Sequence, residues 1–154
     1  MLKTVSSTVL PGDLPAGSII QVVQSQYSTQ VASSAAPGVY VNTGLSAKIT
    51  PKFATSKVLA IFTLNGMATS GAYSGMNTIY YRDAALLFGA ENKSYMSGGV
   101  GGPSTISFTA LDSPNSTAEL TYKSMMALQS GGAGDLYAQL YSSTSTLTLI
   151  EVKA

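Results

Sequence analysis

The sequence contains no cysteine and no histidine in its 154 residues. Without cysteine there is no disulfide framework and no thiol nucleophile, and without either residue a zinc site built from Cys and His is excluded. The Ser-His-Asp and Cys-His mechanisms of hydrolysis are excluded for the same reason. These two absences remove the commonest catalytic and metal-binding chemistries before any pattern is considered.

Charge is also scarce: charged residues make up 10% of the chain, with 8 basic and 7 acidic side chains, and Arg82 is the only arginine. A protein that binds nucleic acid needs clustered Lys and Arg, so we expect no nucleic-acid partner. Low charge also leaves exposed sheet edges poorly protected against pairing. We therefore expect edges that are paired or covered by neighbours.

No apolar run is long enough to cross a membrane. Residues 1–17 (MLKTVSSTVLPGDLPAG) lack the apolar core of a signal peptide. The uncharged span between Asp13 and Lys48 is broken by Gln, Ser, Pro and Gly, so it does not form a membrane helix. We expect no membrane partner. Proline and glycine favour an extended N-terminal arm over residues 1–17, lying either on its own domain or on a partner.

Residues 57–65 (KVLAIFTLN) form the most apolar unbroken run. With a period of two, Val58 and Phe62 fall on one face and Leu59 and Ile61 on the other, so both faces are apolar. Such a short run, rich in β-branched and aromatic residues, predicts a strand buried on both sides. One face meets the core of a sandwich, and a neighbouring subunit is the simplest cover for the other.

The rest of the chain reads as short strands separated by turns, with no helix required except as an alternative over residues 84–88. Regular strand–turn spacing without helices is typical of a sandwich or barrel. We therefore predict an all-β, single-domain antiparallel jelly-roll β-sandwich over residues 18–154. Loops are expected at 66–76 and 89–103. Strands are expected at 18–27, 39–41, 45–50, 57–65, 77–88, 105–111, 119–128, 136–141 and 145–152.

No pattern of polar residues marks a catalytic site. The seven carboxylates show no close pair on one strand face, as a glycosidase would need. No phosphate-binding glycine motif is present, and residues 112–115 (DSPN) read better as a turn than as a calcium site. Arg82–Asp83 is interpreted as a surface or edge pair, with a charge anchor at a subunit contact as the alternative. We expect no enzyme activity, no cofactor and no metal site.

Three stretches resemble a β-sandwich domain of phage structural proteins that is similar in plan to the tumour necrosis factor/C1q jelly roll. They are residues 45–59 (LSAKITPKFATSKVL), 111–123 (LDSPNSTAELTYK) and 145–152 (STLTLIEV), and residues 81–83 (YRD) fit a central strand of that pattern. The resemblance implies a homotrimer whose inner sheet uses the strands at 18–27, 57–65, 119–128 and 145–152. It places these side chains at the trimer interface: Ile20, Val22, Leu59, Ile61, Leu147 and Leu149.

Domains of this kind serve in phage particles as capsid decoration (cement) proteins or as receptor-binding knobs of tail fibres. The short arm favours a trimeric decoration protein, made in the host cytoplasm and bound to the major capsid protein at the capsid surface. The alternatives are a knob that recognises host surface glycans and a lectin-like or polysaccharide-cleaving domain. In the decoration hypothesis the arm docks on the shell through its apolar residues Leu2, Val5, Val9, Leu10 and Leu14.

Overall fold

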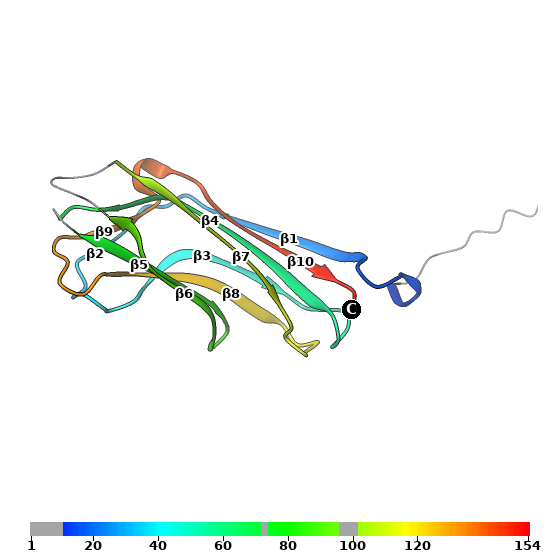
Figure 1. The fold of residues 1–154 in the computed structure, drawn as a ribbon. Helices are drawn as coiled ribbons and strands as arrows, with labels where there is room; N and C mark the ends of the chain where they lie inside the picture. Colours follow the sequence, from blue (N-terminus) through cyan, green and yellow to red (C-terminus); the bar gives the residue numbers. More distant parts are fainter. Residues whose placement is uncertain (1–10, 72–73, 96–101) are drawn as a thin grey trace, which may run out of the picture.

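A computed structural model describes residues 11–71, 74–95 and 102–154, and within them the fold is all-β with only two short 3-10 turns (Figure 1). The turns are η1 (Pro11–Asp13) and η2 (Leu140–Ser142). The strands are β1 (Ile19–Tyr27), β2 (Val31–Ser33), β3 (Val41–Ile49), β4 (Lys57–Thr69), β5 (Gly75–Arg82), β6 (Ala85–Tyr95), β7 (Ser104–Asp112), β8 (Leu120–Leu128), β9 (Leu136–Ala138) and β10 (Ser145–Val152).

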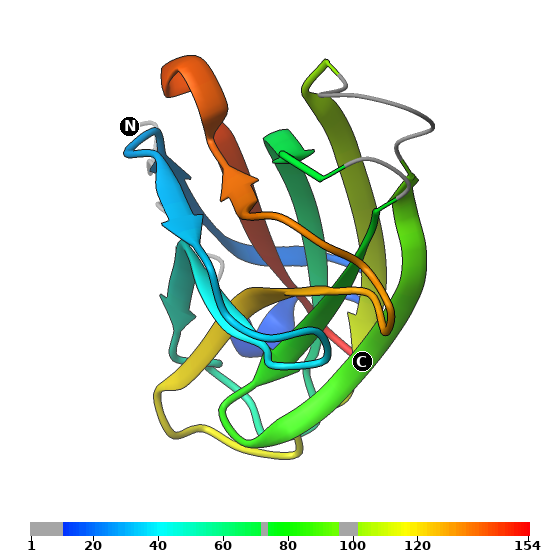
Figure 2. The same ribbon diagram turned by 90° about the vertical axis from the view of Figure 1, so that its left-hand side faces the viewer.

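The strands form two antiparallel sheets packed face to face (Figure 2). The first sheet has the order β1–β10–β4–β7. The short strand β9 pairs with the last residues of β4, beyond the part of β4 that pairs with β10, and β2 pairs with β9. The second sheet has the order β3–β8–β5–β6. The chain passes from one sheet to the other at six of the nine connections between the described strands, as in a jelly roll. The predicted fold class, an antiparallel β-sandwich, is confirmed.

The core lies between the two sheets and is built from alternate residues of each strand. On β4 every second side chain from Val58 to Leu64 is buried, and Phe62 is fully enclosed. Phe62 lies against Tyr80 of the second sheet, with ring centroids 4.7 Å apart. Other large side chains that are fully buried include Leu45, Ile49, Leu64, Met67, Met76, Tyr122, Met126, Leu128, Leu136, Leu147 and Leu149.

Several predicted boundaries were wrong. The predicted loop over residues 66–76 is mostly strand, because β4 continues to Thr69 and β5 begins at Gly75. Residues 77–88 are not one strand but a hairpin that turns at Asp83, whose φ is +50°. The predicted loop over 89–103 begins too early, since β6 continues to Tyr95. The strand at 119–128 also lies in the second sheet, not beside the other three strands that the resemblance grouped with it.

The base of the N-terminal arm is attached to the end of β10. The Gly17 amide donates to the Lys153 carbonyl at 2.8 Å, and the Lys153 amide donates to the Ser18 carbonyl at 2.9 Å. The Lys153 ammonium also donates to the carbonyl oxygens of Gly12 and Leu14, at 2.6 and 2.5 Å. Residues 12–18 are therefore held by their own domain.

Candidate functional site: an uncharged sheet face

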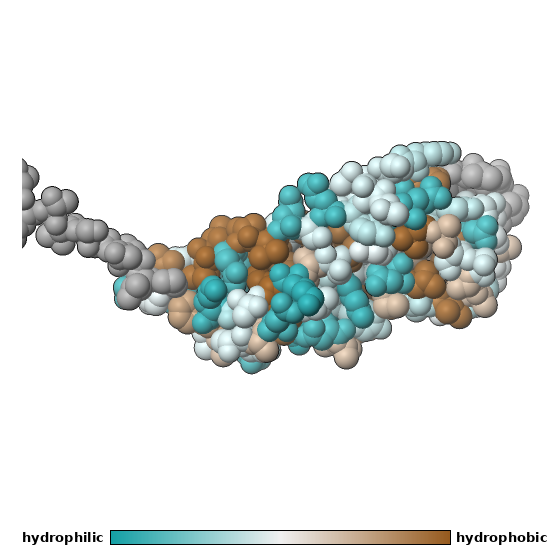
Figure 3. Space-filling view, turned by 180° about the vertical axis from the view of Figure 1, so that it is seen from behind, coloured by the Kyte–Doolittle hydropathy of each residue, from teal (hydrophilic) through white to brown (hydrophobic). Residues whose placement is uncertain are grey.

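The most unusual surface of the molecule is the outer face of the first sheet, the face turned away from the second sheet. One row of residues crosses all four strands there: Val22 of β1 pairs with Ile150, Ile150 with Leu59, and Leu59 with Leu111 of β7. Val22 and Leu111 are each 57% exposed, and the two central residues are half-buried. The row is therefore an apolar stripe on the surface. Figure 3, which views the molecule from behind, shows apolar surface at the end of the molecule where β1 begins and a second apolar area toward the opposite end.

The next two rows of the outer face are polar but carry no charge. The first row contains Gln24, Thr148, Ile61 and Thr109, and the second contains Gln26, Thr146, Thr63 and Ser107. The Gln24 amide donates to the Thr148 hydroxyl at 3.1 Å. The same face therefore offers an apolar stripe beside a band of hydroxyl and amide groups, and these three rows share with the core of an interface their lack of charged residues.

The two edges of the first sheet are equally unprotected. Neither β1 (IIQVVQSQY) nor β7 (STISFTALD) contains proline or lysine, and the one charge, Asp112, lies at the end of β7. Proteins commonly guard long edge strands with lysine, proline or a covering segment. In the part of the chain that the structure describes, β1 pairs only with β10 and β7 only with β4. Both edges are therefore open to pairing or cover by another chain.

The structure divides the six side chains that the resemblance assigned to a trimer interface. Val22, Leu59 and Ile61 lie on the outer face, and Ile20 is half-buried at the irregularity near the start of β1. Leu147 and Leu149 do not lie on this face, because both are fully buried in the subunit core. Their assignment to a subunit interface is corrected: a side chain enclosed within one subunit is not available to another.

Sequence reasoning missed two members of the apolar stripe, Ile150 and Leu111. On β10 the apolar residues occupy both phases of the alternation, so the pattern does not say which phase faces outward. Glu151 is buried on the inward phase, which the sequence did not indicate. For Leu111 the signal was present, since it continues the phase of Thr105, Ser107 and Thr109.

The arm residues Leu2, Val5, Val9 and Leu10 lie outside the described residues. Leu14 is described and is half-buried beside the end of β10. Its carbonyl, bound by Lys153, is part of the attachment of the arm to the domain.

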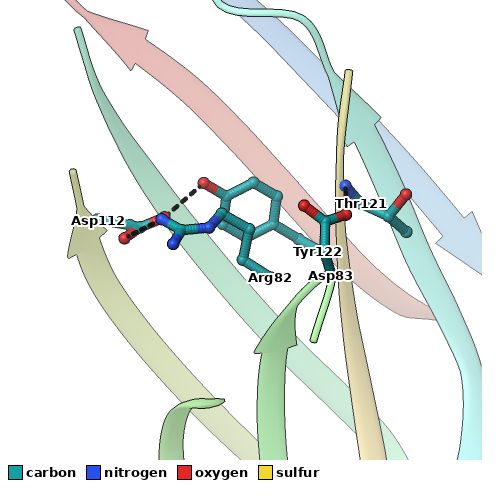
Figure 4. A network of polar contacts seen from close by, with 5 residues as sticks. All are labelled: Arg82, Asp83, Asp112, Thr121 and Tyr122. Carbon is teal, nitrogen blue, oxygen red and sulfur yellow. Dashed lines mark hydrogen bonds and ion pairs between the residues drawn. The ribbon is translucent and has the colours of Figure 1, made fainter. Parts of the chain in front are cut away.

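Arg82 does not pair with Asp83 but forms a bridge between the two sheets (Figure 4). Its Nη1 donates to both carboxylate oxygens of Asp112 on β7, at 2.8 and 2.6 Å. The Tyr122 hydroxyl of β8 donates to the same carboxylate at 2.8 Å. Burial, followed by the hydrogen bond to Asp112, raises the pKa of Tyr122 well above its usual range. The interpretation of Arg82 and Asp83 as a surface or edge pair was wrong, whereas the alternative of a charge anchor at a subunit contact stays a prediction.

The carboxylates of Asp83 and Glu151 also have structural partners. Asp83 Oδ1 accepts the Thr121 amide at 2.9 Å. Glu151 is fully buried and accepts the Lys52 amide at 2.7 Å, the Phe53 amide at 3.3 Å and the Gln21 side-chain amide at 2.6 Å. A buried carboxylate with such partners holds neighbouring segments in place. The carboxylates of Asp83 and Glu151 therefore stabilise the folded domain.

A cluster of metal-binding side chains and a membrane-spanning helix are both absent from the described ranges. No group of three or more acidic side chains there is placed to hold a metal ion. No helix in the same ranges has the length and apolar character needed to cross a bilayer.

The fold is similar to part of VP2 in a subviral particle of infectious bursal disease virus, with a TM-score of 0.54 and 16% sequence identity over 86% of this chain and 33% of that chain. A structure of the Gx strain of the same virus gives a TM-score of 0.51 and 13% identity over 88% of this chain and 33% of that one. The chain thus spans about a third of the length of these viral proteins. At such identities the likeness shows the fold alone. No protein-family model and no curated protein matches the sequence.

Proposed function

We propose that this chain is a non-enzymatic structural protein of a virus particle, a trimeric decoration protein that binds and stabilises the assembled head shell of a phage. The observation that carries the proposal is a set of three neighbouring rows on the outer face of the first sheet that contain no charged side chain, beside a row that holds the exposed Lys57. The likeness of the fold to part of a viral capsid protein supports a structural role.

A second copy of the chain is the partner that best fits the outer face. Across three rows of the face there is no charged side chain, so a strongly charged partner would find no complementary group. Another copy brings the same apolar stripe and the same hydroxyl and amide groups. Covering Val22 and Leu111 would stabilise the assembly by removing apolar surface from water, at about 25 cal/mol per Å².

The N-terminal arm supplies the contact with the shell in this proposal. Leu2, Val5, Val9 and Leu10 are the apolar residues that would dock on the major capsid protein, and Leu14 marks where the arm meets the domain. A protein that binds only the assembled shell stabilises that shell by mass action. The site of action is then the capsid surface of the virion, after synthesis in the host cytoplasm.

The proposal is tested by measuring the ratio of this protein to the major capsid protein in purified virions, by mass spectrometry with labelled standards. One copy per capsid subunit, or per few subunits, is the expected result. A few to a few dozen copies per particle would instead place the protein in the tail, as a knob that recognises host surface glycans. Absence from virions would refute both roles.

A truncation tests the role of the arm. Removing residues 2–10 leaves the Gly12 and Leu14 carbonyls in place for Lys153, so the domain and its self-association should be retained. We expect the truncated protein to lose binding to purified shells. The matched control replaces residues 2–10 with a Gly/Ser segment of equal length. Full shell binding by either variant would refute docking through the arm.

A further inference from the structure

Strands β9 and β10 both pair with β4 and are separated along the chain by a short excursion, residues 139–144, that displays one tyrosine. Tyr141 is 79% exposed, more than any other large hydrophobic side chain of the described residues. Residues 136–138 before the excursion pair with β2, and β9 and β10 both run antiparallel to β4. The chain therefore leaves the edge of β4 after β9 and returns to pair with β4 again as β10.

The backbone of this excursion is in an unfavourable conformation. Gln139, Tyr141 and Ser142 have φ values of +53°, +58° and +57°, a region that residues with a side chain rarely adopt. Strain of this kind persists only where the surrounding structure enforces it, and it is concentrated at functional positions. The strained backbone therefore marks residues 139–142 as a candidate functional position.

The excursion is held in place by Asn65 and Gly66 of β4. The Gln139 amide donates to the Asn65 carbonyl at 3.0 Å, and the Asn65 side-chain amide donates to the Thr144 carbonyl at 2.6 Å. Gly66 lies so close that a Cβ there would be 2.4 Å from the Leu140 nitrogen. Both ends of the excursion are therefore attached to one strand, and Tyr141 is presented on a rigid support.

This support lies on the outer side of the first sheet. The Asn65 side-chain oxygen accepts a hydrogen bond from Thr105 at 2.7 Å, and Thr105 is on the outer phase of β7. Figure 1 shows the coil of η2 on the side of the first sheet away from the second sheet. Tyr141 therefore stands at the far end of the face whose near end carries the apolar stripe.

We propose that Tyr141 is an anchor residue that packs against the outer face of a second copy of this chain. The inference rests on the proposed self-association. Tyrosine is among the residues that most often dominate interface energetics, and a rigid display lowers the entropy lost on binding. The excursion itself (QLYSST) carries no charge, and the three rows of the outer face that it would meet carry none either.

Some of the polar groups around Tyr141 are already used within the subunit. A glycan site needs hydrogen-bonding groups beside the aromatic ring to bind sugar hydroxyls. The Asn65 side chain uses both its oxygen and its nitrogen within the subunit, and the Ser143 hydroxyl donates to the Leu140 carbonyl at 2.7 Å. The excursion offers outward the Tyr141 ring together with the exposed side chains of Ser142 and Thr144, and its lack of charge matches the three uncharged rows of the outer face.

The test measures the oligomeric state by sedimentation velocity over a series of concentrations. Y141A should weaken self-association by about tenfold or more, whereas Y141F, which keeps the ring, should stay within about threefold of the wild type. The matched control is V39A, which trims an exposed side chain (50% exposed) in the connection leading to β3. It should leave the association unchanged. Circular dichroism checks that each variant is folded.

A second variant separates failure of this inference from failure of the proposed function. L111K places a charge in the apolar stripe and should abolish self-association. If L111K dissociates the assembly while Y141A assembles like the wild type, the role of Tyr141 is refuted and the interface stands. If the wild type is monomeric at all concentrations, the self-association and the inference fail together.

Discussion

The bridge between Arg82, Asp112 and Tyr122 gives the sharpest prediction about stability. We consider D112N, which keeps the shape of the side chain and removes its charge. In the folded protein the carboxylate accepts two contacts from Arg82 Nη1 and one from the Tyr122 hydroxyl. The amide oxygen of the variant still accepts the tyrosine hydroxyl, but the guanidinium is left without its anionic partner.

The expected loss follows from burial. The Arg82 and Asp112 side chains are 21% and 11% exposed, so water only partly replaces the lost contact. Hydrogen bonds to charged groups contribute about 1.5–3 kcal/mol, and breaking a fully buried pair costs about 3–5 kcal/mol. With Arg82 partly solvated, we expect D112N to lower the free energy of unfolding by about 2–3 kcal/mol. For a chain of this length that is about 4–12 °C in Tm.

The assay is chemical unfolding followed by circular dichroism at a fixed protein concentration, because self-association would otherwise shift the midpoint. The matched control is E119Q, which breaks the ion pair of Lys48 and Glu119, whose side chains are 62% and 58% exposed. An exposed pair contributes about 0–1 kcal/mol, so E119Q should change little. A loss below about 0.5 kcal/mol for D112N would show that the bridge does not hold the two sheets together.

Three further predictions concern the same domain. E151A should cost about 2–4 kcal/mol in urea unfolding, because it removes the acceptor of two part-buried backbone amides and of the Gln21 side-chain amide; a neutral result would contradict this. G44A should lower the Tm measurably, because φ is +85° at this residue and a Cβ would lie 2.2 Å from the Tyr27 ring. The control is G38A, where φ is also positive but the space around the added Cβ is open. The free energy of unfolding should fall above about pH 10, because Tyr122 ionises in the unfolded chain while its raised pKa keeps it protonated in the folded protein. D112N should make this fall smaller, and the same pH profile in the variant and the wild type would refute the contribution of Asp112.

Much of the architecture could be predicted because alternation is a strong signal in a sandwich. The outward and inward phases of residues 57–64 were read correctly, and Pro51 falls in the connection after β3, which ends at Ile49. The boundaries near residues 66–76 failed because glycine and serine there suggested a loop. In the structure Gly66 is needed within β4 to let the 139–144 excursion approach.

The candidate site was predicted only in part, because sequence alternation does not identify partners across sheets. Arg82 was assigned to its neighbour in sequence, whereas its partner Asp112 is thirty residues away on the other sheet. On β10, Leu149 and Ile150 are adjacent apolar residues, and only the register with β4 shows that Ile150 faces outward. The strained display of Tyr141 had no sequence signal, since none of its positive-φ residues is glycine.

The position of β10 has a consequence for how the protein is made. This strand lies in the middle of the first sheet, between β1 and β4, yet it follows every other strand in the sequence. Gln21 and Glu151, which are hydrogen-bonded neighbours, are 130 residues apart along the chain. At about 5–20 residues per second, β1 and β4 leave the ribosome several seconds before the strand that joins them. During that time β1 has no partner strand, and β4 lacks its neighbour on the β10 side although it can already pair with β7. The nascent chain, more than the finished domain, is therefore the form exposed to aggregation.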